Sequence, residues 1–280
     1  MPARAGGAGA GATAASRALL DAVAALARGA GEIVMEVYAR GSAQARTKAD
    51  ASPVTEADER AEAYIVPRLQ ALLPGVPVVA EEAVAAGRLP LQELSSVPRF
   101  WLVDPLDGTR EFLARNGEFT VNIALVEAGC PVLGVVFVPA EPDEGMLYSG
   151  VAGLGAWRAR GRAAPEPIAV RREPAEGLTL VSSRSHDDAA ALETFLAAHL
   201  RGRRVASRRT AGSPMKLCLV ACGQADLYPR LGRTMEWDIA AGHAVLAAAG
   251  GQVLTLQGEP LRYGKPGLVN PGFVAVGGGA

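Results

Sequence analysis

The sequence contains few cysteines and no long hydrophobic run. Its three cysteines, Cys130, Cys218 and Cys222, are odd in number, and no two of them have Cys-x-x-Cys spacing, which argues against a disulfide scaffold or a zinc ribbon. Cys218 and Cys222 stand in an apolar segment, where free cysteine packs as a small hydrophobic residue. No run of about 18 apolar residues occurs, and the first residues lack the apolar stretch of a signal peptide. We therefore expect no integral membrane segment and a cytoplasmic location, with peripheral membrane association left open.

The chain also lacks an excess of charge of one sign. Its 28 Lys and Arg residues and 29 Asp and Glu residues give a formal net charge of −1 over 280 residues, so no basic surface for nucleic acid is indicated. Hydrophobic residues make up 49% of the chain, which is ordinary for a globular protein and sufficient for one large or two modest domains. An anionic substrate stays compatible with this balance, because a bound divalent metal would attract it.

The first half of the chain combines helical and strand patterns. Residues 1–16 are mostly Ala and Gly, which predicts a disordered tail. Apolar residues at helical spacing predict a helix over residues 17–39, and Thr55-Glu56-Ala57-Asp58 has the form of a capping box that opens a second helix. A hairpin loop is expected over 127–131. Short β-rich runs predict strands at 76–80, 100–103, 119–126, 132–138 and 146–149.

In the second half, strands and helices alternate. The patterns predict strands at 178–182, 204–207, 225–228, 252–256 and 273–276, and helices at about 188–200, 215–221 and 237–249. This alternation is typical of an α/β protein. A segment rich in Arg, Pro and Glu at 160–176 is the best candidate for a boundary. We therefore predict an α+β domain over 17–175 and an α/β domain over 176–280.

An apolar strand runs directly into two acids, Asp104 and Asp107. Pro105 fixes the backbone between them, and Gly108 allows the chain to approach a ligand closely. Such a turn can direct both carboxylates and the carbonyl of Leu106 at one point, and Mg²⁺ prefers oxygen ligands of this kind. The same residues also suit a solvated turn, and the isolated motif does not decide between the two.

Two further acids stand at the ends of predicted elements. Glu81 follows the strand at 76–80, and Asp238 opens the Ala-rich helix near residue 237. An N-terminal Asp also caps a helix, so Asp238 by itself supports either role. The combination of these acids with Asp104 and Asp107 predicts a magnesium site.

Several motifs, in this order, resemble those of the inositol monophosphatase superfamily of lithium-sensitive, Mg²⁺-dependent phosphatases. They are Asp104-Pro105-Leu106-Asp107-Gly108-Thr109 and Trp237-Asp238-Ile239-Ala240-Ala241-Gly242. Longer stretches resemble the CysQ-type 3′(2′),5′-bisphosphate nucleotidases of that superfamily, at 48–58, 116–125, 183–186 and 227–230. The resemblance covers residues 19–276. It implies a layered αβαβα sandwich in which an α+β N-terminal half and an α/β C-terminal half meet at the metal cleft.

The resemblance also implies a role for each matching residue. Two or more Mg²⁺ ions would be bound by Glu81, Asp104, Leu106 (through its carbonyl), Asp107 and Asp238. Asp58 and Thr109 would act together on the attacking water, because Asp58 orients the Thr109 hydroxyl. Substrate contacts would come from Gly108, Thr109, Ser183, His186, Ser213, Lys216 and Arg230. Pro214 and residues 83–91 depart from the family pattern, which leaves the pocket shape open.

The implied reaction is hydrolysis of the 3′-phosphate of adenosine 3′,5′-bisphosphate to AMP and phosphate, a step of sulfur metabolism. Its sulfated form, 3′-phosphoadenylyl sulfate, is a further candidate substrate. The closest alternative is an inositol or sugar monophosphatase with the same metal site, and an alternative of another class is a non-catalytic protein that senses a nucleotide or a metal. The expected partner is a small-molecule phosphate ester, without nucleic acid, bound by a monomer or a homodimer.

Overall fold

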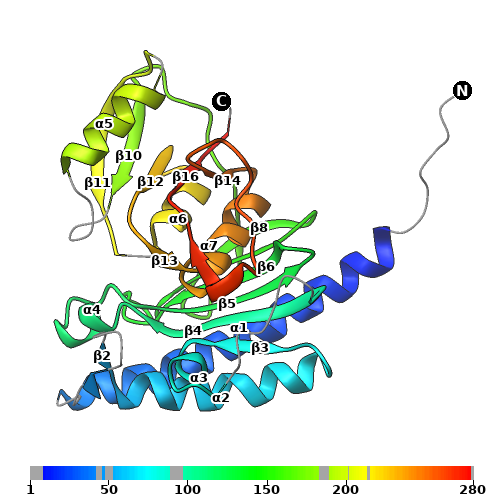
Figure 1. The fold of residues 1–280 in the computed structure, drawn as a ribbon. Coiled ribbons are helices and arrows are strands. Elements are labelled where there is room, and N and C mark those ends of the chain that lie inside the picture. The colour runs from blue at the N-terminus through cyan, green and yellow to red at the C-terminus, as the bar shows by residue number, and fades with distance from the viewer. Residues whose placement is uncertain are drawn as a thin grey trace, which may run out of the picture.

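Helices and sheets alternate through the molecule as layers of helix, sheet, helix, sheet and helix (Figure 1), so the predicted αβαβα class is confirmed. The computed structural model describes residues 9–41, 46–47, 53–88, 97–182, 189–200, 202–212 and 215–278. In this part of the chain, no helix is both long and apolar enough to span a membrane.

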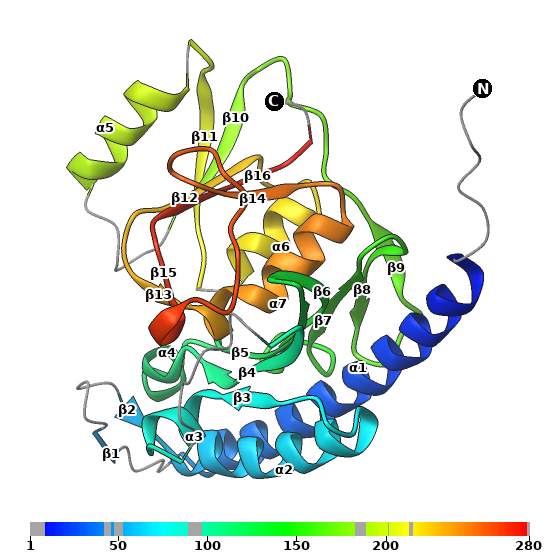
Figure 2. The same cartoon turned by 45° about the vertical axis from the view of Figure 1, so that its right-hand side comes forward.

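Two helices, α1 (Gly9–Arg40) and α2 (Glu56–Leu72), form the first layer and lie side by side (Figure 2). The sequence predicted the start of α1 at residue 17 and a disordered tail before it. The helix instead begins at Gly9, which fits the high helix propensity of the alanines in that segment. The predicted capping box of α2 is confirmed, because Thr55 Oγ1 accepts a hydrogen bond from Ala57 N at 3.1 Å and Asp58 Oδ2 accepts one from Thr55 N at 2.8 Å.

These helices cover one face of a seven-stranded sheet of order β3-β4-β5-β6-β7-β8-β9. Only the β3–β4 pair in this sheet is parallel. Glu127 pairs with Cys130 across the expected hairpin loop. The sequence analysis missed the last two strands, which lie at the edge of the sheet and carry half-exposed polar residues. The strands are β3 (Val78–Ala80), β4 (Arg99–Asp107), β5 (Thr120–Glu127), β6 (Cys130–Val138), β7 (Met146–Val151), β8 (Gly155–Arg160) and β9 (Glu166–Ile168).

The second half of the chain forms a five-stranded sheet of order β11-β10-β12-β16-β14. Its outer face is covered by α5 (Ala189–His199), whose Leu192, Phe195 and Leu196 pack on this sheet. The strands are β10 (Leu178–Ser182), β11 (Val205–Thr210), β12 (Leu227–Arg230), β14 (Gln252–Thr255) and β16 (Phe273–Val276). The strands of the larger sheet thus come before the predicted domain boundary at residues 175/176 in the sequence, and the strands of the five-stranded sheet come after it. The division into two domains stays a prediction.

The short elements complete the description. Two-stranded sheets pair β1 (Arg46–Thr47) with β2 (Pro53–Val54) and β13 (Thr234–Met235) with β15 (Val269–Asn270). The short helices are α3 (Glu81–Ala85), α4 (Thr109–Leu113) and the 3₁₀ turn η2 (Pro266–Leu268).

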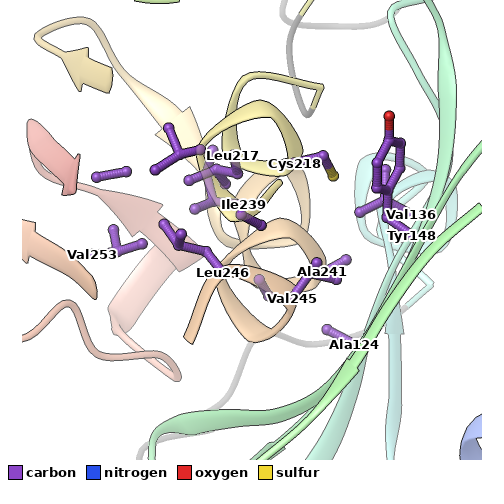
Figure 3. Close-up of a cluster of buried hydrophobic side chains, with 14 of the residues drawn as sticks. Ala124, Val136, Tyr148, Leu217, Cys218, Ile239, Ala241, Val245, Leu246 and Val253 are labelled. Atoms are coloured by element: carbon purple, nitrogen blue, oxygen red, sulfur yellow. The ribbon is translucent and has the colours of Figure 1, made fainter. Parts of the chain in front are cut away.

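Between the two sheets lie α6 (Met215–Ala221) and α7 (Glu236–Ala248), which form a shared core with both (Figure 3). Cys218 is fully buried there, which confirms its predicted role as a small hydrophobic residue. A Cβ atom on Gly134 of β6 would lie 2.3 Å from the carbonyl oxygen of Ala241, so only glycine allows α7 to approach the sheet this closely. This contact fixes the position of α7, and with it the first turn that carries Asp238.

Candidate active site

The turn that holds the paired acids is a bulge in the larger sheet. Asp104 pairs with Asn122 and Asp107 with Thr120, so four residues of β4 face three of β5. A bulge of this kind changes the direction of the side chains in the bulged strand. Gly108 follows with φ of +92°, and a Cβ atom there would lie 3.0 Å from the carbonyl oxygen of Glu118. The backbone of this turn therefore requires glycine at position 108.

The two acids of the turn differ in exposure, because Asp107 as a whole is only partly buried. Asp104 is buried, and its Oδ1 accepts a hydrogen bond from Leu106 N at 3.1 Å. Asp107 Oδ2 is also buried and has no hydrogen-bond partner. Because an unpartnered buried carboxylate oxygen is costly, this atom is suited to bind a cation.

The residues predicted to orient the attacking water are brought together from distant parts of the chain. Thr109 Oγ1 lies 3.1 Å from Asp58 Oδ1 and 3.3 Å from the carbonyl oxygen of Leu106, and its single proton can be donated to one of them at a time. The other carboxylate oxygen of Asp58 accepts hydrogen bonds from the main-chain N and the Oγ1 of Thr55, at 2.8 and 2.6 Å. The capping box of α2 therefore fixes the carboxylate that contacts Thr109.

Asp238 stands in the first turn of α7. Its Oδ2 accepts a hydrogen bond from Met235 N at 2.8 Å, so the capping role that the sequence left open is observed. A carboxylate has two oxygens, so this cap does not exclude a second role for Asp238 at the same position. Glu81 is the first residue of α3 and directly follows β3, as the sequence predicted.

The carboxylates at this site influence one another strongly. Burial, followed by the negative charge of Glu81, raises the pKa of Asp107 to about 7. Burial, followed by the charges of Asp107 and Glu81, raises the pKa of Asp238 well above its ordinary value. Side chains from three separate elements thus share one partly buried acidic region, in which a divalent cation would relieve the mutual repulsion.

The donor set fits Mg²⁺, because every candidate ligand is an oxygen atom and one of them, Asp107 Oδ2, is buried without a partner. Among the residues that the structure describes, no three His, Cys, Asp or Glu side chains are arranged so as to enclose a metal ion. The acids therefore share a region without converging on one point.

Two buried cations face the acids. Lys216 is 1% exposed, and its Nζ donates to the carbonyl oxygens of Ala211 and Gly212 at 3.1 Å each. Arg230 is also buried, and its Nε has no hydrogen-bond partner. The positive charges of both residues act on Asp107 and oppose the rise of its pKa. An anion placed between the acids and these cations would be held from one side by Lys216 and Arg230. The other predicted substrate contacts, Ser183, His186 and Ser213, lie outside the described residues.

Three polar residues beside the site were missed by the sequence analysis. Glu62 of α2 is 6% exposed, and its Oε2 accepts a hydrogen bond from Glu82 N at 2.8 Å; burial raises its pKa, opposed by this bond. Asn122 accepts a hydrogen bond from Thr120 Oγ1 at 3.0 Å, and Asn270 donates to the Met235 carbonyl at 2.9 Å. The alternation of polar Thr120 and Asn122 with apolar residues in β5 was a usable signal, because polar side chains on the buried face of a strand require partners.

Comparison with known proteins places the chain among phosphatases. Residues 16–274 match the model described as the inositol monophosphatase family. The 3′(2′),5′-bisphosphate nucleotidase CysQ of Escherichia coli K12 is 44% identical over 261 residues, which is 91% of this chain and 98% of that protein. The crystal structure of CysQ from Bacteroides thetaiotaomicron superposes with a TM-score of 0.76 at 38% identity, over 93% of this chain and 98% of the other. An inositol monophosphatase from Anabaena gives a TM-score of 0.68 at 26% identity, over 94% and 91%.

Proposed function

The chain belongs to the inositol monophosphatase family, and we propose that it is a Mg²⁺-dependent 3′(2′),5′-bisphosphate nucleotidase. Its substrate would be adenosine 3′,5′-bisphosphate, with 3′-phosphoadenylyl sulfate as a further candidate. Hydrolysis cleaves the bond between phosphorus and the ribose 3′ oxygen, joins a water oxygen to phosphorus and leaves AMP and phosphate. The similarity to CysQ proteins along nearly the whole chain supports this substrate class.

The observation that carries the proposal is the hydrogen bond between Thr109 and Asp58 at the edge of the partly buried acidic region. While Thr109 donates its proton to Asp58 at 3.1 Å, the lone pairs of its hydroxyl oxygen are free to accept a proton from a water molecule. Asp58 cannot turn away, because Thr55 holds its other oxygen. This pair would orient the attacking water.

The acidic region would hold two or more Mg²⁺ ions through Glu81, Asp104, Asp107, Asp238 and the carbonyl of Leu106. When bound, Mg²⁺ supplies charge neutralisation at the phosphate and lowers the pKa of a coordinated water.

The phosphate ester would be bound on the opposite side of the site. Lys216 and Arg230 would pair with its oxygens, and the backbone at Gly108 would allow its close approach. Contacts from Ser183, His186 and Ser213 to the nucleotide stay part of the proposal.

The first experiment measures phosphate release from adenosine 3′,5′-bisphosphate, inositol 1-phosphate and fructose 1,6-bisphosphate. Each substrate is assayed with Mg²⁺, with EDTA and with Mg²⁺ plus Li⁺. We expect Mg²⁺-dependent turnover with preference for the nucleotide. Preference for inositol or sugar phosphate would retain the metal site and refute the nucleotide specificity, and no turnover of any substrate would favour a non-catalytic binding protein.

A pair of variants tests the residue assignment. Asp104→Asn removes a carboxylate from the buried region and should lower turnover by at least on the order of 10²-fold. Asp143→Asn makes the same chemical change at an exposed position between β6 and β7 and serves as the control. Equal activity of the two variants would show that Asp104 does not bind the metal.

A further inference from the structure

The α2 helix carries a second buried carboxylate, Glu62, one turn after Asp58. Residues four apart lie on the same face of a helix, so Asp58 and Glu62 face the same side of α2. Asp58 contacts Thr109, as described above. Glu62 Oε2 contacts the neighbouring α3, where it accepts a hydrogen bond from Glu82 N at 2.8 Å.

This bond is made to the first turn of the helix that begins with Glu81. Glu82 directly follows Glu81 in this turn, so the bond to Glu62 restrains the backbone beside the residue that carries the Glu81 side chain. The negative charge of Glu81 also acts on Glu62, which places the two carboxylates in one electrostatic neighbourhood. The attraction between Glu62 and the Arg88 guanidinium is weak, because Arg88 Nη2 lies 3.7 Å from Glu62 Oε1 and the Arg88 side chain is 66% exposed.

A glutamate is a costly way to fill this position. Burying a carboxylate requires compensation by hydrogen bonds, and here a main-chain donor of one short turn contributes it. An apolar side chain could fill the same space but could not accept this hydrogen bond. The interaction that distinguishes Glu62 from an apolar residue is therefore its hydrogen bond to the first turn of α3.

We propose that Glu62 is a positioning residue that fixes the backbone after Glu81 and so directs the Glu81 carboxylate toward Asp107 and Asp238. This inference rests on the proposed function, which assigns Glu81 as a metal ligand. One face of α2 then sets the geometry of both parts of the site, because Asp58 holds the Thr109 hydroxyl and Glu62 holds the turn of Glu81.

The experiment compares Glu62→Met, which fills the space without an acceptor, with Glu62→Gln, which keeps one acceptor oxygen. Mg²⁺ binding is measured by calorimetry without substrate, and the Mg²⁺ concentration for half-maximal activity is measured separately. Loss of residues that orient metal ligands typically weakens metal affinity about 10- to 100-fold. We expect a loss of that size for Glu62→Met and a smaller one for Glu62→Gln, while kcat at saturating Mg²⁺ and KM for the nucleotide stay within about twofold.

Glu59→Gln is the matched control, because Glu59 lies on the same helix but is half-exposed and pairs with Arg46 at the surface. It should bind Mg²⁺ as the wild-type chain does. Urea unfolding verifies that each variant is folded. If Glu62→Met does not fold, the Mg²⁺ affinity of Glu62→Gln tests the positioning role.

The outcomes separate this inference from the proposed function. Wild-type Mg²⁺ affinity in both Glu62 variants would overturn the positioning role and leave the metal site intact. If kcat and substrate affinity fall together with Mg²⁺ affinity, Glu62 has a general structural role, and this result would also overturn the positioning role. A wild-type chain that binds no Mg²⁺ would overturn the metal assignment and this inference together.

Discussion

Acid should destabilise this protein through His243, which lies in the middle of α7. The side chain is 8% exposed, and its Nδ1 lies 3.0 Å from the hydroxyl of Tyr263. Burial, followed by the positive charge of Lys265, lowers the pKa of His243 from 6.5 to about 3. The folded protein therefore keeps this imidazole neutral at pH values where the unfolded chain protonates it.

The sign and size of the effect follow from proton linkage. Below pH 6.5 the unfolded state binds a proton that the folded state excludes, so the free energy of unfolding falls as the pH falls toward 3. Each pH unit in this window removes about 1.4 kcal/mol. At pH 4.5 the loss from His243 should reach about 2.7 kcal/mol, a large fraction of the roughly 5–15 kcal/mol that stabilises a typical domain.

Urea unfolding at pH 7.5 and pH 4.5 tests this expectation in the wild-type chain and in His243→Gln. Glutamine is neutral at both values, so the variant should lose about 2.7 kcal/mol less than the wild type. Other titrating groups, including Asp107 and Asp238, are common to both proteins and cancel in the comparison. Tyr263→Phe, which keeps the histidine buried, should retain the wild-type loss. Equal losses in the wild type and His243→Gln would refute the reasoning.

Three further predictions concern the site and its support. Because the pKa of Asp107 is about 7 without metal, Mg²⁺ must displace a proton from Asp107 at lower pH. Calorimetry should therefore find Mg²⁺ binding about tenfold weaker at pH 6 than at pH 8. Mg²⁺ affinity that does not change with pH would contradict this prediction. Gly134→Ala places a methyl group against the Ala241 carbonyl and should destabilise the protein by about 1–3 kcal/mol in urea unfolding. Glu236→Gln removes the negative charge that pairs with Lys265 Nζ at 2.6 Å. The free energy of unfolding should fall by about 2–3 kcal/mol, which lowers the midpoint of thermal unfolding. An unchanged midpoint would show that this pair does not stabilise the protein.

Much of the fold was readable from local sequence signals. The capping box at Thr55 begins α2 as predicted, and the patterns for α6 and β16 give the observed bounds. These signals work because cap chemistry and apolar periodicity act within a few residues. The start of α1 and the strands β8 and β9 were missed, because Ala-rich and half-exposed segments carry weak periodic patterns.

The candidate site was also predicted from the sequence only in part. Acids at the ends of apolar runs identified Glu81, Asp104, Asp107 and Asp238 from the sequence, because carboxylates at such positions need a charge partner or solvent. Their roles as metal ligands stay predictions, and so does the proposed substrate.

The sequence by itself determined many of the elements, the turn of Asp104 and the family. The tertiary structure gave the contact between Asp58 and Thr109 that the resemblance implied. Only the tertiary structure decided that Glu62 holds the first turn of α3 and that burial shifts the pKa of Asp107. The physical reason is distance along the chain. Local propensities act between neighbours in sequence, whereas desolvation and charge coupling depend on which distant segments the packing of α2, α3 and α7 brings together.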